Sequence, residues 1–278
     1  MTHIGVALAI ALSFGCAVSV YGLRWLELSM TFHPVQLTAD QRVAPPDGAG
    51  DVWFTAADGT RLHGWYFAAS EPGAPTIVYF HGNGGNISNV GWLGGSLARR
   101  GFGVLLFDYR GYGLSDGTAA DEADLYLDGE AAVSFLTREK GVAPERIVLY
   151  GQSLGTAIAT ETATRQKAGA LILESGFSSA SSLAETALPW LPRFLHVVGR
   201  NRFESARKLK SIRIPVLVSH GDPDPVIPVA EGRALYAAAN EPKKLLIVPG
   251  GGHNVFGSAG TPYLDQVEEF IRRATESR

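Results

Sequence analysis

Three residue types spaced along this sequence can together carry out acyl transfer: a serine, an aspartate and a histidine. Ser153 lies in GQSLG, residues 151–155, but the same GxSxG pattern recurs as GLSDG, residues 113–117, around Ser115. A serine hydroxyl becomes nucleophilic only when a base removes its proton and a further group orients that base. With 33 glycines in 278 residues the short pattern also arises by chance. Its structural context therefore decides which serine is reactive.

The context favours Ser153 over Ser115. The apolar run IVLY ends at Tyr150, GQSLG follows at once, and TAIATETA begins a helical pattern, which places Ser153 on a sharp strand-to-helix turn. Residues 109–112 separate the second motif from the strand VLLFD, and Asp116 next to Ser115 would disfavour a negatively charged oxygen. We predict Ser153 as the nucleophile and Ser115 as a structural loop serine.

The base is predicted among seven histidines. His253, in VPGGGHNVFG, follows the strand LLIV on a glycine-rich loop before the last helix, at the carboxyl edge where Ser153 lies. The orienting acid is expected at the end of the preceding strand, where SHGDPDPVIP offers both Asp222 and Asp224. The residues alone do not separate these two carboxylates, because they lie in the same turn.

A glycine-rich loop supplies candidate donors for an oxyanion. FHGNGGN, residues 80–86, follows the strand TIVYF, so the main-chain N–H groups of Asn83 and Leu154 are predicted to form an oxyanion hole. The rival interpretation is a phosphate-binding loop. It is disfavoured because the segment has neither the lysine of a P-loop nor the spacing of a dinucleotide fingerprint.

The elements that must position these residues alternate between strands and helices. DVWFT and RLHGWYF flank the turn pair Asp58 and Gly59, which predicts an antiparallel hairpin. Six runs then follow with the apolar composition of strands buried on both faces: TIVYF, VLLFD, IVLY, ALILE, PVLVS and KLLIV. Helical patterns lie between them, at about 86–99, 121–139, 154–166 and 229–239, and a last helix is predicted from Thr261 and Pro262. The sequence predicts an α/β fold with a mainly parallel open sheet, an antiparallel N-terminal hairpin and helices on both faces.

An insertion, about residues 177–203, is predicted to form a short helical lid over the site. Trp190, Leu191 and Phe194 within it are candidates to line an acyl pocket. The alternative is that these side chains pack the lid onto the domain. We leave both interpretations open.

The N-terminus predicts a membrane anchor. Residues 4–23 form a stretch of twenty residues without a charge, enough to cross the hydrocarbon of a bilayer. We therefore divide the chain into an anchor (1–25), a linker (26–50) and one α/β domain (51–278). A cleaved signal, giving a secreted or periplasmic protein, and a buried helix are the alternatives. Arg24 and Arg42 after the span lean towards a cytosolic domain, but they do not fix the side of the membrane.

Composition excludes several function classes. The net charge is −3, and the densest basic run, residues 207–213, has no interleaved aromatic residues, so we interpret it as a solvated helix face and expect no nucleic-acid partner. Cys16 is the single cysteine, which excludes an intramolecular disulfide and a cysteine zinc site. No two histidines have metal-ligand spacing. We expect no metal, no cofactor and no obligate protein partner.

Taken as a set, these motifs resemble the α/β-hydrolase superfamily, and more narrowly the small, N-terminally anchored hydrolases related to abhydrolase-domain proteins, often labelled serine aminopeptidase-like. The resemblance covers about residues 32–275, through FHP, DGTRLHGWY, FHGNGGN, DYRGYGLSDG, GQSLG, HGDPDPVIP and GGGHN. It implies the α/β-hydrolase fold and a triad in the order Ser, Asp, His. The family pattern HGxxDxxVP assigns the acid to Asp224, beside Ser153, His253 and the oxyanion residue Asn83.

These observations predict a serine hydrolase that cleaves carboxylic esters or thioesters through an acyl-enzyme. An anchor beside an apolar lid favours a small acyl or lipid-like substrate. A serine peptidase or aminopeptidase-like hydrolase is the first alternative. The second is a membrane-tethered binding protein that has kept the fold without the activity.

Overall fold

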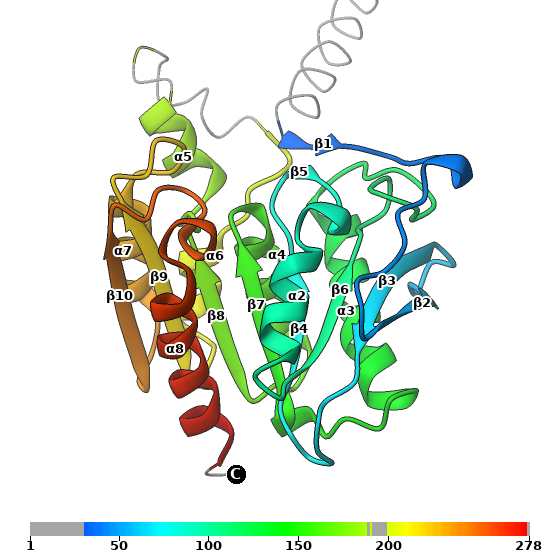
Figure 1. The fold of residues 1–278 in the computed structure, drawn as a ribbon. Helices are drawn as coiled ribbons and strands as arrows, with labels where there is room; N and C mark the ends of the chain where they lie inside the picture. The colour runs from blue at the N-terminus through cyan, green and yellow to red at the C-terminus, as the bar shows by residue number, and fades with distance from the viewer. Residues whose placement is uncertain (1–30, 188–189, 191–198, 277–278) are drawn as a thin grey trace, which may run out of the picture.

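An eight-stranded sheet runs through the middle of the molecule, in the order β10-β9-β8-β7-β4-β6-β3-β2 (Figure 1). The computed structural model describes residues 31–187, 190 and 199–276. The strands of the sheet are β2 (Ala49–Thr55), β3 (Arg61–Phe67), β4 (Thr76–Phe80), β6 (Gly103–Phe107), β7 (Ile147–Gln152), β8 (Ala170–Glu174), β9 (Val216–Asp222) and β10 (Lys243–Pro249).

The strand directions follow the prediction. β2 pairs with β3, and β3 with β6, in antiparallel register, whereas every pairing from β6 through to β10 is parallel. All residues of β4, β6 and β8 are buried, as expected for apolar runs covered on both faces. A mainly parallel sheet entered through an antiparallel hairpin is thus confirmed.

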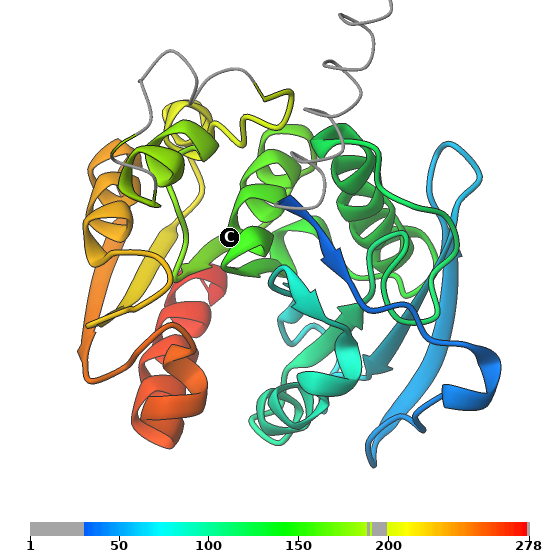
Figure 2. The same cartoon turned by 90° about the horizontal axis from the view of Figure 1, so that it is seen from above.

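Helices cover both faces of this sheet. The helices are α2 (Gly91–Ala98), α3 (Glu122–Arg138), α4 (Leu154–Arg165), α5 (Ala180–Ala187), α6 (Ser205–Leu209), α7 (Val229–Ala238) and α8 (Val255–Glu276), and η1 (Ala39–Gln41), η2 (Ile87–Asn89) and η3 (Pro144–Arg146) are short 3-10 turns. One buried apolar cluster joins α3, α4, α6 and α7 to the sheet, and a second joins α2 and α8 to its other face. Figure 2 shows these two layers from above.

Two predicted helix starts differ from the structure. The segment from residue 86 first forms η2, because the Asn86 side chain accepts the Ser88 N–H, and α2 begins only at Gly91. The last helix was predicted from Thr261, but α8 begins at Val255. It breaks at Gly260, whose φ of 56° is not helical, so the second part starts near the predicted residue.

The basic run at residues 207–213 is solvated as predicted, except at Lys208. It includes the end of α6, but the Lys208 ammonium lies 2.6 Å from the Glu161 carboxylate and donates to the Tyr126 hydroxyl at 2.8 Å. The Lys208 side chain is only 13% exposed. This cation therefore holds α6 against α3 and α4. The hydrophobic periodicity of the sequence could not show that Glu161 and Tyr126 are the partners of Lys208.

The N-terminal linker is attached to the domain. β1 (His33–Pro34) pairs in parallel with β5 (Gly84–Gly85), and Gln36 forms a bridge to Gly113. The predicted anchor, residues 1–25, and the first residues of the linker lie outside the described residues. Within the described part of the chain, no helix is long and apolar enough to span a bilayer.

Candidate active site

Ser153 lies at the turn between β7 and α4. Its backbone has φ 54° and ψ −119°, a conformation that is strained for a residue with a side chain. A Cβ atom at Gly155 would lie 1.9 Å from the Phe80 carbonyl oxygen, and one at Gly151 would lie 2.4 Å from the Gly155 carbonyl oxygen. Glycine is therefore required on both sides, which is the mechanical reason for the GxSxG spacing.

The structure brings Ser153, His253 and Asp224 together. His253 Nε2 lies 3.1 Å from Ser153 Oγ, and His253 Nδ1 lies 2.8 Å from Asp224 Oδ2. Asp224 Oδ1 accepts the N–H groups of Val226 at 2.8 Å and Ile227 at 3.0 Å. Four contacts thus link the three side chains and fix the carboxylate in its loop.

Asp222 and Asp224 have clearly different surroundings. The Asp224 side chain has no exposed surface and contacts His253, whereas Asp222 is exposed. The main-chain carbonyl of Asp222 accepts the Gly250 N–H at 2.8 Å. Asp222 therefore supports the loop of His253 through its backbone, and its carboxylate faces solvent.

His220 is a buried neighbour of this site that sequence reasoning did not select. Its Nε2 lies 2.8 Å from the Ile227 carbonyl oxygen and 3.3 Å from Asp224 Oδ2. Because a carbonyl oxygen only accepts, Nε2 carries the proton. The imidazole therefore donates to the Ile227 carbonyl and stabilises the loop that contains Asp224. The sequence shows His220 near the end of a strand, before a glycine. Its contacts with Ile227 and Asp224 depend on the path of the loop that follows this strand, which the sequence does not show.

The glycine-rich loop at residues 80–86, predicted to supply an oxyanion hole, lies directly beside the serine. A Cβ atom added to Gly82 would lie 3.4 Å from Ser153 Cβ. Asn83 comes next in the chain, and its side-chain Oδ1 accepts the His33 N–H at 3.0 Å and the Tyr112 hydroxyl at 3.1 Å. Leu154 opens α4, so its N–H has no acceptor within the helix. Both predicted donors thus belong to segments that border Ser153.

Ser115 has a different role. Its hydroxyl donates to the Asp108 carbonyl at 2.7 Å and accepts the His63 N–H at 2.9 Å, and the residue is 1% exposed. The side chain joins the loop after β6 to β3 and has no free surface for a substrate. The structure agrees with its interpretation as a structural serine.

A buried glutamate joins the turn of Ser153 to the loop of His253. The Glu174 carbonyl accepts the Ser153 N–H at 2.9 Å. Its carboxylate accepts the Phe256 N–H at 3.3 Å, the Tyr263 hydroxyl at 3.1 Å and the Tyr150 hydroxyl. Burial raises the pKa of Glu174 above its ordinary value, although these donors oppose the shift. Sequence reasoning missed this residue, because it treated the end of ALILE only as a strand.

We predict a pH signature for Glu174. A folded-state pKa above the ordinary 4.5 means that ionising the carboxyl costs stability in the fold. Its contribution to the free energy of unfolding is greatest below pH 4.5 and is lost as pH rises through the folded pKa. Glu174→Gln removes this slope, so the difference in urea-unfolding free energy between wild type and variant should change with pH from 4.5 upwards. A difference that is independent of pH would contradict the assignment.

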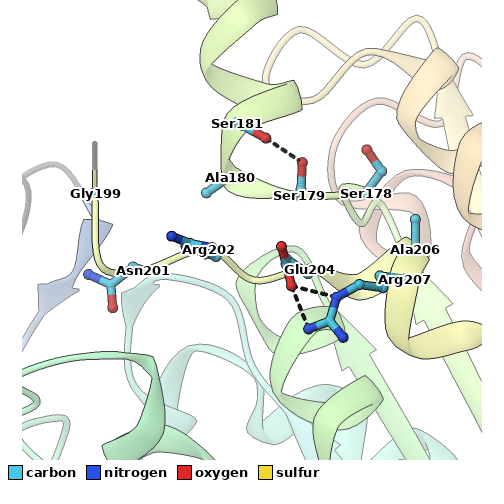
Figure 3. A pocket seen from close by; sticks show the side chains of 10 residues that line it. All are labelled: Ser178, Ser179, Ala180, Ser181, Gly199, Asn201, Arg202, Glu204, Ala206 and Arg207. Atoms are coloured by element: carbon cyan, nitrogen blue, oxygen red, sulfur yellow. Dashed lines mark hydrogen bonds and ion pairs between the residues drawn. The ribbon is translucent and has the colours of Figure 1, made fainter. Parts of the chain in front are cut away.

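The predicted lid, about residues 177–203, is described in part. Trp190 is 76% exposed, and the candidate pocket residues Leu191 and Phe194 lie outside the described residues. A cavity of about 550 Å³ lies between the start of α5 and the segment that leads into α6 (Figure 3). Its lining combines polar side chains with apolar surface and does not include Ser153, Asp224 or His253; the residues are Ser178, Ser179, Ala180, Ser181, Gly199, Asn201, Arg202, Glu204, Ala206 and Arg207. In the described ranges, no three His, Cys, Asp or Glu side chains gather in a way that could hold a metal.

Comparison with known proteins identifies the family. A family model described as serine aminopeptidase, S33, matches residues 72–207. The chain is 35% identical to the uncharacterized protein YfhR of Escherichia coli (strain K12) over 274 residues, which cover 94% of this chain and 93% of that protein. It is 38% identical over 205 residues to the uncharacterized protein Rv2307c of Mycobacterium tuberculosis, covering 73% and 72%.

The chain belongs to the S33 family of α/β hydrolases.

Solved structures show the same fold for this S33 hydrolase. The Pyrococcus furiosus esterase Pf2001 matches with a TM-score of 0.69 and 20% identity, over 87% of this chain and 97% of that chain. An acetyl xylan esterase from Paenibacillus sp. R4 matches with a TM-score of 0.63 and 21% identity, over 84% and 86%. At these identities the likeness establishes the fold alone, and the α/β-hydrolase fold predicted from the sequence is confirmed.

Proposed function

We propose that this S33 hydrolase cleaves carboxylic esters or thioesters, with Ser153 as nucleophile, His253 as base and Asp224 as the orienting acid. The observation that carries the proposal is the continuous line of contacts from Ser153 Oγ through the imidazole to a fully buried carboxylate. A hydroxyl, an imidazole and a carboxylate in this order are the parts that acyl transfer requires.

The chemistry follows from the contacts. His253 Nε2 accepts the proton of Ser153 Oγ as the oxygen attacks the substrate carbonyl, and Asp224 stabilises the imidazolium through Nδ1–H. The N–H groups of Asn83 and Leu154 receive the oxyanion, helped by the N-terminus of α4. The imidazolium then protonates the leaving alcohol or thiol. Water, activated by His253, releases the acid and restores Ser153.

The absence of carboxylates from the two segments beside Ser153 supports an acyl ester rather than a peptide with a free amino group. An aminopeptidase needs a carboxylate to bind the substrate ammonium, but residues 81–98 and 250–264 beside Ser153 contain no Asp or Glu. The structural neighbours Pf2001 and the Paenibacillus enzyme carry the name esterase, which agrees with this choice. A lipid-like acyl substrate remains our proposal for the natural class.

Chain-length profiling tests the proposal. Purified enzyme is given p-nitrophenyl esters of increasing acyl length beside aminoacyl-anilides. We expect ester hydrolysis that depends on Ser153 and little cleavage of the anilides. Preferred cleavage of anilides would favour the peptidase. Folded protein that cleaves neither and does not react with a fluorophosphonate would instead favour the binding protein without activity.

Tyr112 is predicted to position the oxyanion loop. Tyr112→Phe removes one of the two donors to Asn83 Oδ1. Because one hydrogen bond contributes about 1 kcal/mol, we expect kcat to fall about 5-fold while KM stays the same. Tyr126→Phe is the matched control, since it also removes a hydroxyl contact, between α3 and α6. An unchanged kcat, or an effect on KM alone, would contradict this role for Tyr112.

A further inference from the structure

The segments that immediately surround Ser153 are poor in charge. Four segments lie around the serine: 31–38, which pairs with the oxyanion loop; 81–98, which contains that loop; 175–184, which follows β8; and 250–264, which carries His253. None of them contains Asp, Glu, Lys or Arg, although these residues make up 18% of the chain. Charged residues at the carboxyl ends of the strands lie in other segments, among them the β2–β3 turn (Asp58), the loop after β6 (Arg110 and Asp116) and the end of β9 (Asp222).

Exposed apolar side chains gather on the same edge. Six large hydrophobic residues are exposed in the described part of the chain, and four of them are on loops or helix starts at this edge. They are Val35 after β1 (47% exposed), Trp92 at the start of α2 (49%), Trp190 in the lid (76%) and Val226 in the aspartate loop (59%). The Trp92 ring lies 4.6 Å from the ring of Phe256, three residues after His253. Grouped exposure of this kind marks an interaction surface.

The opposite edge has the reverse character. The loops that enter the strands from their amino ends are rich in charged residues; they include RRG (99–101), REKGVAPER (138–146), RQK (165–167), KSIR (210–213) and EPKK (241–244). The segments next to Ser153 are therefore uncharged, whereas the loops at the opposite edge are charged. Proteins that lie on bilayers show the same division between an apolar contact face and a solvated one.

The chain enters the domain at the carboxyl edge of the sheet. At His33 it is already paired with Gly84, and Figure 1 shows β1 at the same end of the sheet as α5. The apolar run ends at Leu23, ten residues before His33, so the connection reaches at most about 35 Å. A domain of this size is about 45 Å across. If residues 4–23 span a bilayer, the charged edge is too far away to rest on it.

We propose that the carboxyl edge of the sheet lies on a phospholipid bilayer, so that the opening to Ser153 faces the lipid surface. The uncharged segments, the exposed apolar side chains and the place where the chain enters the domain all indicate one occupant. That occupant is a bilayer, because it is the surface to which residues 4–23 would tether this edge. The orientation stands independently of the catalytic proposal. Together with that proposal, it means that acyl groups carried by membrane lipids or lipid-linked molecules reach the serine without crossing water.

Site-specific fluorescence quenching tests this orientation in the full-length chain. Cys16→Ser removes the single cysteine, and single cysteines labelled with an environment-sensitive fluorophore are then introduced. Trp92→Cys, Trp190→Cys and Val226→Cys report on the carboxyl edge; the matched set for the amino edge is Arg99→Cys, Lys140→Cys and Lys167→Cys, all exposed. The proteins are reconstituted into phosphatidylcholine and phosphatidylglycerol vesicles, with and without lipid that carries a nitroxide near the headgroup.

We expect blue-shifted emission and at least about 3-fold stronger quenching at the carboxyl edge than at the amino edge. Equal quenching, stronger quenching at the amino edge, or protein that does not float with the vesicles overturns the proposal. Blue-shifted emission without lipid quenching, together with a dimer by sedimentation, would assign the edge to a second copy and also overturn it. Ser153→Ala should give the same pattern as wild type, so a failure of the catalytic proposal is recognised separately.

Discussion

Ser153→Ala is expected to lower kcat for ester hydrolysis by about 10⁴ to 10⁶ and to abolish labelling by a fluorophosphonate. The reason is the absence of any second nucleophile in reach of the base among the described contacts: His253 Nε2 lies 3.1 Å from Ser153 Oγ. The fold should survive, because the variant keeps both glycines of the turn and its main-chain bond to Glu174. Initial rates with a p-nitrophenyl ester, beside gel labelling, measure both effects.

Ser115→Ala is the control with the same local pattern. It removes two buried hydrogen bonds, so we expect a loss of stability of about 1–3 kcal/mol, with labelling and kcat preserved in the folded protein. Full labelling of Ser153→Ala would show that the nucleophile lies elsewhere. Loss of labelling in well-folded Ser115→Ala would point to GLSDG instead.

Asp224→Asn should be the second most damaging change, with kcat lower by about 10⁴. Asp224 Oδ2 accepts the proton on His253 Nδ1, so an amide that donates there would favour the wrong imidazole tautomer. Asp224 also accepts two main-chain N–H groups through Oδ1, and these contacts can persist with an amide oxygen. We therefore expect a large loss of kcat with a small change in melting temperature.

Asp222→Asn is the matched control, two residues away in the same turn. Its exposed carboxylate faces solvent and only its main-chain carbonyl is used, so kcat should stay within about 2-fold of wild type. For each of the two variants, kcat and the melting temperature by circular dichroism are measured. Equal losses at both positions, or a larger loss at Asp222, would refute the assignment of the acid.

Local patterns were sufficient to predict the elements that carry the site. Buried strands such as β4 and β8 are continuous apolar runs, and Ser153 is flanked by a strand and a helix that the sequence shows directly. Sheet order then brings the ends of β7, β9 and β10 to one edge. The position of Ser153 and His253 at that edge could therefore be predicted before the structure.

Contacts between distant segments could not be predicted in the same way. Asp222 and Asp224 have the same local chemistry, and only the path of the turn directs one carboxylate to His253. Glu174 and His220 are buried polar residues at strand ends, and their partners come from loops far along the chain. The attachment of residues 33–37 to the glycine-rich loop at residues 80–86 could not be predicted for another reason. It is made mostly by main-chain groups, which leave no signal in composition.

Peptide mass spectrometry of the wild-type enzyme tests the central claim most directly. The protein is reacted with a fluorophosphonate, digested and sequenced by tandem fragmentation, so the modified residue is read without any mutation. We predict a single phosphonyl adduct, on Ser153 within GQSLG. An adduct on Ser115 or on any other residue, with Ser153 unmodified, would contradict it.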